Sequence, residues 1–232
     1  MLLKRTWLLR GGSKSKHVTL HITEDALRVC GSYLAEGSIR GDGRTVQFTF
    51  NRKEIRYASL VKAWSDSIGV SYSEALGRGT RTVYLYSKAL AGWFKEMFGN
   101  GAFAKKLPQW LLLASATEQS MALEYYFRGD GCLWDESRSA FKATSRSITL
   151  AKQVQQTLLS NKIVCCLNAT QDHGEPRYEM SISGASAVGV AKEWNLRLPK
   201  RKHRYNHIQF VKGYAQFPVR RVVEFIEKEE EE

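Results

Sequence analysis

The chain has 232 residues, of which 43% are apolar, and carries a formal net charge of +12. This apolar fraction excludes a disordered chain, and this length is sufficient to bury a substantial core. The excess of 35 lysines and arginines over 23 acidic residues favours a polyanionic partner, most often nucleic acid. No apolar run approaches the roughly 20 residues needed to span a membrane, and the 4 cysteines and 5 histidines show no zinc-ligand spacing. We therefore expect an intracellular protein that is not secreted, has reduced thiols and has no membrane partner.

The first predicted element, after an N-terminal extension at residues 1–22, is a helix that begins near Thr23. Threonine favours the N-cap position, and the two acidic residues that follow it lie where the helix dipole stabilises negative charge. Apolar and small residues recur along this helix at the spacing of a buried stripe: Leu27, Cys30, Gly31 and Leu34. The helix ends at Glu36, and we expect Gly37 to adopt a left-handed C-cap conformation there.

The elements that follow are distinguished by their periodicity and by the turn residues between them. In chain order they are a half-buried strand at 45–50, an amphipathic helix at 54–67, two strands at 70–76 and 82–86, a helix at 88–98 and a basic Leu-Pro element at 105–108. Strict alternation in the first strand places Val46, Phe48 and Phe50 on the core face and Thr45, Gln47 and Thr49 on the opposite face.

This series of elements is then repeated. Residues 123–131 resemble residues 29–37, because each stretch ends in a small residue, a carboxylate and a glycine; the carboxylates, Glu36 and Asp130, lie 94 residues apart. The second series comprises a helix at about 117–129, a strand at 140–144, a helix at 147–161, strands at 164–169 and 178–182, a helix at 185–194 and a basic Leu-Pro element at 198–202. The same order found twice indicates an internal duplication.

The duplication predicts an α+β fold of two αββαββα half-domains related by a pseudo-twofold axis, at residues 23–113 and 114–215. Residues 216–232 follow as a C-terminal helix and acidic tail. If the two motif helices pack side by side, Glu36 and Asp130 become neighbours at helix C-termini, where the dipole disfavours negative charge. A bound divalent cation would relieve that repulsion. Simple Glu-Gly and Asp-Gly turns are the alternative for either motif alone, but not for two motifs at matching positions.

The motif at residues 31–37 and its counterpart at 123–131 resemble the paired motifs of the LAGLIDADG, or dodecapeptide, homing endonucleases. The resemblance is strongest to intein-type endonuclease domains with two motifs in one monomeric chain. Residues 48–54 and 105–108 also resemble that group, and the similarity extends over roughly residues 25–205. It implies a central motif-helix interface and two antiparallel DNA-binding sheets. It also implies metal-dependent hydrolysis of two phosphodiesters in a long asymmetric double-stranded DNA target, which leaves 3′ overhangs.

The resemblance and the chemistry of phosphodiester hydrolysis together select candidate metal ligands and catalytic residues. The carboxylates of Glu36 and Asp130 are expected to bind Mg²⁺, with Mn²⁺ or Ca²⁺ able to substitute in binding, and the carbonyls of Ala35 and Gly129 are additional ligands. A lysine near each phosphate would stabilise developing charge. Lys105 matches the family position in the first half. In the second half, Lys200 fits the internal register, and Lys202 is the alternative.

Candidate DNA contacts lie on or beside the predicted sheet faces, where arginine, lysine, glutamine and threonine can bind phosphates or base edges. They are Arg40, Arg44, Gln47, Arg52, Arg78, Lys142, Thr144, Arg146, Arg177 and Lys202. The tryptophans on predicted helices are expected in the core instead: Trp64, Trp93 and Trp194.

The sequence departs from the family pattern at two motif positions. Tyr125 stands where the family usually has a small residue, which questions how tightly the helices cross. Glu36 replaces the commoner aspartate. We also expect no self-splicing apparatus, because Met1 is not a splicing nucleophile and the acidic tail has no terminal His-Asn.

Three other functions fit parts of the same pattern. A non-cleaving DNA-binding regulator would retain the fold but usually lacks the acidic pair, and an RNA intron maturase would use the same basic surface. A basic structural protein would not need the two motif ends. Double-stranded DNA remains the expected partner of a monomer that has no obligate protein partner.

Overall fold

The computed structural model describes residues 5–10, 18–135, 140–196, 209–211 and 214–216. Its first half contains one four-stranded antiparallel sheet, with strand order β3-β4-β6-β5. The elements of this half are α1 (Glu24–Glu36), β3 (Gly37–Ile39), β4 (Thr45–Asn51), α2 (Ile55–Ser67), β5 (Tyr72–Leu76), β6 (Thr80–Tyr86) and α3 (Lys88–Phe98). Helix, two strands, helix, two strands and helix therefore follow one another as predicted.

The second half repeats this topology in a sheet with strand order β7-β8-β10-β9. After α4 (Gln109–Leu112), its elements are α5 (Ala116–Gly129), β7 (Gly131–Asp135), β8 (Ala140–Ser145), α6 (Ile148–Ser160), β9 (Cys165–Asp172), β10 (Glu175–Ile182) and α7 (Gly184–Glu193). A short hairpin of β11 (Gln209–Val211) and β12 (Tyr214–Gln216) follows. The equivalent strand orders confirm the predicted α+β fold of two αββαββα halves.

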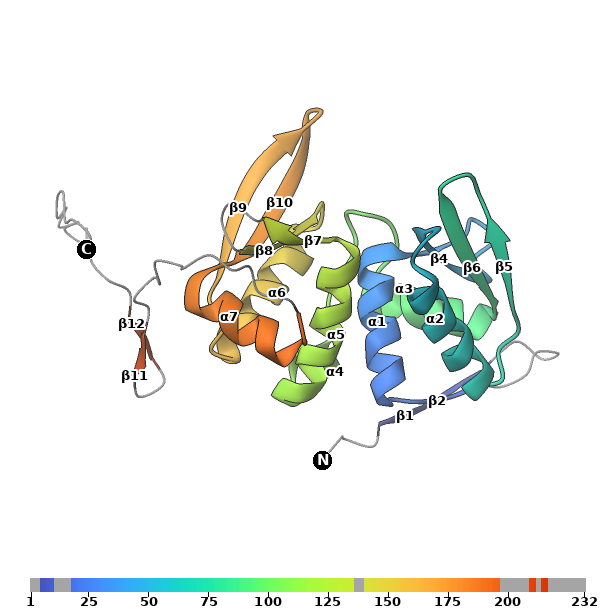
Figure 1. Cartoon of the computed structure of the whole chain (residues 1–232). Coiled ribbons are helices and arrows are strands. Elements are labelled where there is room, and N and C mark those ends of the chain that lie inside the picture. The colour runs from blue at the N-terminus through green and yellow to red at the C-terminus, as the bar shows by residue number, and fades with distance from the viewer. Residues whose placement is uncertain (1–4, 11–17, 136–139, 197–208, 212–213, 217–232) are drawn as a thin grey trace, which may run out of the picture.

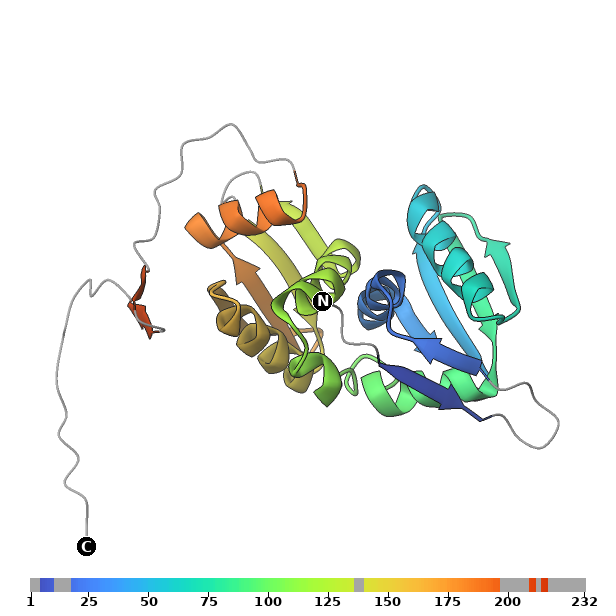
Figure 2. The ribbon, with the colours of Figure 1, turned by 90° about the horizontal axis from the view of Figure 1, so that it is seen from below.

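The two motif helices lie at the centre of the molecule. Figures 1 and 2 show α1 and α5 side by side between the two sheets. In Figure 1 the β5–β6 and β9–β10 hairpins project on the same side as the C-terminal ends of both helices. The carboxylate-bearing ends of the motifs therefore share one side of the molecule with the two hairpins. None of the described helices is both long and apolar enough to cross a membrane.

Small residues allow α1 and α5 to cross closely. A Cβ added at Gly31 would overlap the carbonyl oxygen of Ala122, and one added at Gly129 would lie 2.5 Å from Cβ of Ala35. Tyr125 does not hold the helices apart, because its ring packs edge-on against Tyr57 of α2, with centroids 5.9 Å apart. The close crossing is thus compatible with the tyrosine that departs from the family pattern.

The helix ends show how local sequence sets the element boundaries. The Thr23 side chain accepts a hydrogen bond from the Ala26 N–H, which confirms the predicted N-cap of α1. Helix α5 begins at Ala116, because Ser115 and Glu118 form a capping box. The predicted left-handed C-cap at Gly37 is wrong, since its φ of −90° and ψ of 148° are extended. Glycine is needed there for space: an added Cβ would overlap the backbone and ring of Tyr33.

The faces of β4 follow the predicted alternation with one exception. Val46, Phe48 and Phe50 are buried in the core, and Gln47 is only half-buried on the opposite face. Thr45 is buried rather than exposed, because its hydroxyl donates to the carboxylate of Asp42 at 2.8 Å. The three tryptophans predicted in the core are buried: Trp64, Trp93 and Trp194.

The segment predicted as an N-terminal extension contributes to the core of the first half. It forms an antiparallel hairpin of β1 (Thr6–Leu9) and β2 (Val18–His21). Val18 and Leu20 are buried, and the Trp7 ring packs against Trp93 with centroids 5.8 Å apart. This hairpin therefore closes one end of the first half's aromatic core.

Candidate metal centre and nucleic-acid surface

The C-terminal ends of α1 and α5 bring the two motif carboxylates together. Glu36 is the last residue of α1, and Asp130 is the cap residue that directly follows α5. A Cβ added at Gly129 would lie 3.6 Å from Oε1 of Glu36. The carboxylate of Glu36 therefore lies against the end of the helix that presents Asp130.

Both carboxylates lie in surroundings that disfavour their charged forms. Burial raises the pKa of Asp130 to about 7, with repulsion from Glu36 as the second cause and Lys105 opposing both. Burial and then repulsion from Glu54 raise the pKa of Glu36, and Lys105 again opposes them. Within the described parts of the chain, neither carboxylate accepts a side-chain hydrogen bond or forms an ion pair. Two carboxylates without a positive partner in direct contact among the described residues are in the situation that a bound cation stabilises.

The donor set fits Mg²⁺, although it is small. Magnesium usually binds one or two carboxylates and completes its octahedron with waters and substrate phosphates. No cluster of three or more histidine, cysteine, aspartate or glutamate side chains occurs among the residues described, so Glu36 and Asp130 form a pair without a third such ligand. The Ile39 N–H, which would bond the Ala35 carbonyl if α1 continued, donates instead to Oδ1 of Asn100 at 2.8 Å. The Ala35 carbonyl is thereby left without that helical partner, as a backbone ligand requires.

Lys105 lies at the C-terminal end of α1, close enough to both carboxylates to affect their pKa values. Its buried ammonium donates to the carbonyls of Tyr33, Leu34 and Gly37, at 3.2 Å for Leu34 and 2.7 Å for Gly37. Burial lowers the pKa of Lys105 to about 8, although Asp130 and Glu36 both raise it. In this geometry the three ammonium donors satisfy carbonyls at the end of α1. Lys105 therefore stabilises the helix end that carries Glu36, and its predicted catalytic role stays a prediction.

A cavity of about 520 Å³ opens beside Asp130. Lys105 lines it from the first half, while Thr144, Arg146 and Arg177 line it from the second. Asp172, at the end of β9, also lines it. Most of the charged groups around the cavity are cations that can bind phosphate oxygens, and Asp130 lies within reach of the same space.

The candidate DNA contacts of the first half surround its sheet. Arg40 is exposed and its guanidinium lies over the Tyr84 ring, 5.4 Å from the centroid. Arg44, Arg52 and Arg78 are also exposed. Gln47 donates to the Ser38 hydroxyl at 2.8 Å on the face opposite the core. These side chains are placed where an outer ligand can reach them.

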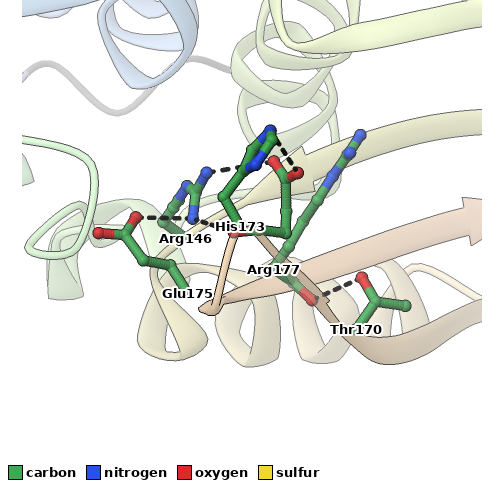
Figure 3. A network of polar contacts seen from close by, with 6 residues as sticks. Arg146, Thr170, His173, Glu175 and Arg177 are labelled. Atoms are coloured by element: carbon green, nitrogen blue, oxygen red, sulfur yellow. Dashed lines mark hydrogen bonds and ion pairs between the residues drawn. The ribbon is translucent and has the colours of Figure 1, made fainter.

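The candidate contacts of the second half are placed differently, because two of them are ion-paired. Lys142 lies 3.0 Å from the carboxylate of Glu179. Figure 3 shows Arg146 held by its neighbours at the β9–β10 turn, whereas Arg177 points away from that network. Thr144 is half-buried on the same sheet. Lys200 and Lys202 lie outside the residues that the structure describes.

Two acidic residues near these sites were not singled out from the sequence. Glu54 raises the pKa of Glu36, and its own carboxylate accepts the Asn51 N–H at 2.8 Å. Asp172 is the last residue of β9 and lines the cavity beside Asp130. Glu54 ends the stretch at 48–54 that resembles the family, but only the folded chain brings either residue to the site.

No family model matches the chain. The ATP-dependent DNA helicase Hel308 of Thermococcus kodakarensis is 28% identical over 222 residues, which covers 88% of this chain and 19% of the helicase. An uncharacterized protein of Methanocaldococcus jannaschii is 30% identical over 132 residues, covering 51% of this chain and 15% of that protein. The chain therefore spans less than a fifth of the length of either relative.

Solved structures resemble the chain over most of its length. The homing endonuclease I-DmoI, in a study of its mesophilic variants, has a TM-score of 0.57 at 14% identity, covering 73% of this chain and 93% of that chain. I-DmoI in complex with DNA and Mn has a TM-score of 0.56 at 14% identity, covering 73% of this chain and 94% of that chain. The N-terminal LAGLIDADG domain of DUF199/WhiA has a TM-score of 0.51 at 9% identity, covering 78% of this chain and 84% of that chain. The strand orders, the paired central helices and these similarities together show that the chain has the LAGLIDADG fold.

Proposed function

We propose that this protein is a site-specific endonuclease that hydrolyses one phosphodiester in each strand of a long asymmetric DNA duplex. The observation that carries the proposal is the pair of carboxylates, Glu36 and Asp130, at the meeting ends of α1 and α5. Neither forms an ion pair with any residue that the structure describes. A protein that only bound DNA would gain nothing from holding two anions together in this position. The same fold in I-DmoI, solved in complex with DNA and Mn, supports the proposal.

The carboxylates of Glu36 and Asp130 would hold Mg²⁺, with the carbonyls of Ala35 and Gly129 as further ligands. When bound, the ion supplies Lewis-acid stabilisation of the phosphate and lowers the pKa of a coordinated water. Lys105 keeps the end of α1 in place through its three carbonyl contacts, which positions Glu36. We propose that Mn²⁺ and Ca²⁺ can occupy the same site.

DNA would lie across the two sheets on the side where the hairpins and the motif ends meet (Figure 1). Arginines of the first half would bind phosphates, and Arg177 beside the cavity would do so in the second half. We further propose cleavage by a monomer to leave 3′ overhangs. On this proposal, the two half-domains that lie on the DNA are residues 23–113 and 114–215.

The match to Hel308 covers nearly all of this chain but a small share of the helicase. This proportion supports the proposal that the chain is an intron- or intein-type homing endonuclease module that larger host proteins can carry. On this proposal it acts inside the cell, on the genomic DNA that it cuts.

The proposal is tested by cleavage of a genomic or randomised duplex library in Mg²⁺, with the cut ends sequenced. We expect discrete cleavage at one long site, and a loss of at least about 100-fold in rate for Glu36→Gln or Asp130→Asn, as is typical when a charge-stabilising catalytic group is removed. Glu96→Gln on the exposed surface of α3 is the matched control and should cut like the original protein. Undiminished cutting by both motif variants would contradict the site.

A non-cleaving DNA-binding protein is the second candidate. The similarity to the LAGLIDADG domain of DUF199/WhiA favours considering it, because the fold also occurs in a protein that is not named an endonuclease. Tight, sequence-selective binding by the original protein without any cleavage in Mg²⁺ or Mn²⁺ would select this function over the first.

A further inference from the structure

The two halves differ in how the cations of their sheet surfaces are partnered. In the first half, Arg40, Arg44, Arg52 and Arg78 form no ion pair with any residue that the structure describes. Arg40 makes a cation–π contact with Tyr84 instead. Because no described carboxylate forms an ion pair with these guanidinium groups, each can bind a phosphate without first leaving such a partner.

In the second half, two cations of the sheet surface, Arg146 and Lys142, are held by carboxylates. Nη1 of Arg146 lies 2.7 Å from Oε2 of Glu175, and Nη2 lies 3.2 Å from Oδ2 of Asp172. The Asp172 carbonyl accepts a further bond from Nη1 at 3.5 Å. Lys142 on the neighbouring strand is likewise paired with Glu179 at 3.0 Å. Figure 3 shows the Arg146 guanidinium bound to this acidic turn, while the Arg177 side chain extends away from it.

The contrast is sharpest at one pair of equivalent positions. Arg52 and Arg146 are 94 residues apart, as are the motif carboxylates, and each directly follows the second strand of its sheet. Arg52 reaches the carbonyl of Gly77 at 3.4 Å in a turn whose residues 77–79 read Gly-Arg-Gly. Arg146 meets a turn whose residues 172–175 read Asp-His-Gly-Glu. Both halves therefore have an arginine at this position. Among the described residues, carboxylates form ion pairs only with the arginine of the second half.

The paired arginine lies beside the reaction site. Arg146, Arg177 and Asp172 line the cavity that also contains Asp130 and Lys105. A carboxylate at this surface repels phosphates and accepts hydrogen bonds from base amino groups, cytosine N4 above all. Arg146 must therefore exchange its carboxylate partners before it can bind a phosphate or a guanine edge.

We propose that Asp172 and Glu175 are specificity-determining residues of the second half. By holding Arg146, these carboxylates weaken the binding of the second half to DNA of arbitrary sequence. They release Arg146 only where contacts to the bases compensate for the lost ion pairs. The first half, whose arginines have no ion-pair partner among the described residues, provides the attachment that does not depend on sequence. This inference rests on the proposed function, because it requires DNA to lie across both sheets.

The test measures binding of a fluorescently labelled duplex of scrambled sequence, in EDTA so that no strand is cut, at several salt concentrations. We expect Asp172→Asn/Glu175→Gln to bind this duplex about 10-fold more tightly, with a salt dependence steeper by about one phosphate contact. Adding Arg146→Gln should abolish most of this gain. The same Arg146→Gln change in the original protein should reduce affinity for this duplex less, because Asp172 and Glu175 already occupy the arginine there.

The matched control is Glu24→Gln/Asp25→Asn at the opposite end of α1. These two carboxylates also hold a single arginine, Arg28, at 2.9 and 2.8 Å, so the variant removes equal charge and frees one arginine away from the proposed DNA surface. An equal gain in this control would overturn the inference, since net charge alone would then explain the effect. A gain that survives Arg146→Gln would overturn it as well. If the original protein binds no DNA at all, the proposed function itself fails.

Discussion

At the scale of single residues, burial outweighs the attraction between opposite charges in the motif site. Asp130 and Lys105 stabilise each other's charge, yet the pKa of Asp130 is raised to about 7 and that of Lys105 is lowered to about 8. In both cases the first cause is removal from water. Without a metal ion, Asp130 therefore holds a proton over much of the range below neutral pH.

This raised pKa makes the stability of the metal-free protein depend on pH. The folded state favours neutral Asp130, so its contribution is fully present below the ordinary pKa of 3.8 and is lost as pH rises through about 7. Asp130→Asn keeps the neutral form at every pH. We expect it to raise the free energy of unfolding by about 1–3 kcal/mol at pH 8 and by much less at pH 5.

Urea unfolding in EDTA at the two pH values measures the difference between Asp130→Asn and the original protein. Asp66→Asn, on the exposed surface of α2, is the control and should change stability equally at both. An Asp130→Asn effect that is the same at pH 5 and pH 8 would show that the carboxylate is not held in its neutral form.

At the scale of elements, the crossing of α1 and α5 depends on the absence of a side chain at Gly31. An added Cβ would overlap the Ala122 carbonyl oxygen and lie 3.0 Å from Cβ of Tyr125. The backbone of α5 cannot move aside without shifting Asp130 at its end. The spacing of the two carboxylates is therefore set by helix packing as well as by the motifs themselves.

Gly31→Ala should consequently destabilise the protein by about 1–3 kcal/mol, the usual range for overpacking. Gly92→Ala is the matched control, because Gly92 lies within α3 with open space where a Cβ would be added. That substitution should stabilise the helix by about 0.5–1 kcal/mol. Thermal unfolding of the two variants gives the comparison, and a stabilising Gly31→Ala would contradict the close crossing.

The longer elements could be predicted from the sequence to within a few residues, because amphipathic helices and half-buried strands have strong periods. The predicted and observed bounds of α3 coincide at residues 88–98. Strand β3 is too short to show a period. The hairpin at Thr6–Leu9 and Val18–His21 was taken as an extension, because its strands are short and its burial comes from contact with distant residues such as Trp93.

At the scale of the whole molecule, the proposed metal site belongs to neither half alone. Glu36 comes from the first half and Asp130 from the second, and Lys105 from the first half contacts the end of α1 while lining the cavity beside Asp130. A cation bound by both carboxylates would join the two halves. Its binding should therefore stabilise the entire fold.

We expect Mg²⁺ at about ten times its dissociation constant to raise the free energy of unfolding by about 1.4 kcal/mol. For a chain of this size that corresponds to an increase of about 3–6 °C in the Tm. Differential scanning calorimetry with and without Mg²⁺ measures it, with added NaCl of equal ionic strength as the reference. Glu36→Gln/Asp130→Asn should show no Mg²⁺-dependent increase, and an unchanged increase in this variant would place the ion elsewhere.

The sequence by itself determined the duplication, the order of the elements and the two carboxylates, because each depends on local spacing and residue type. Only the tertiary structure decided which groups surround those carboxylates. It placed the Lys105 ammonium on the carbonyls that end α1, the Glu54 carboxylate near Glu36, and Asp172 in the cavity beside Asp130. It also paired Arg146 with carboxylates, whereas Arg52 forms no ion pair with the residues described and contacts the Gly77 carbonyl instead. Burial and ion pairing are properties of contacts between distant segments, so no local pattern in the chain records them.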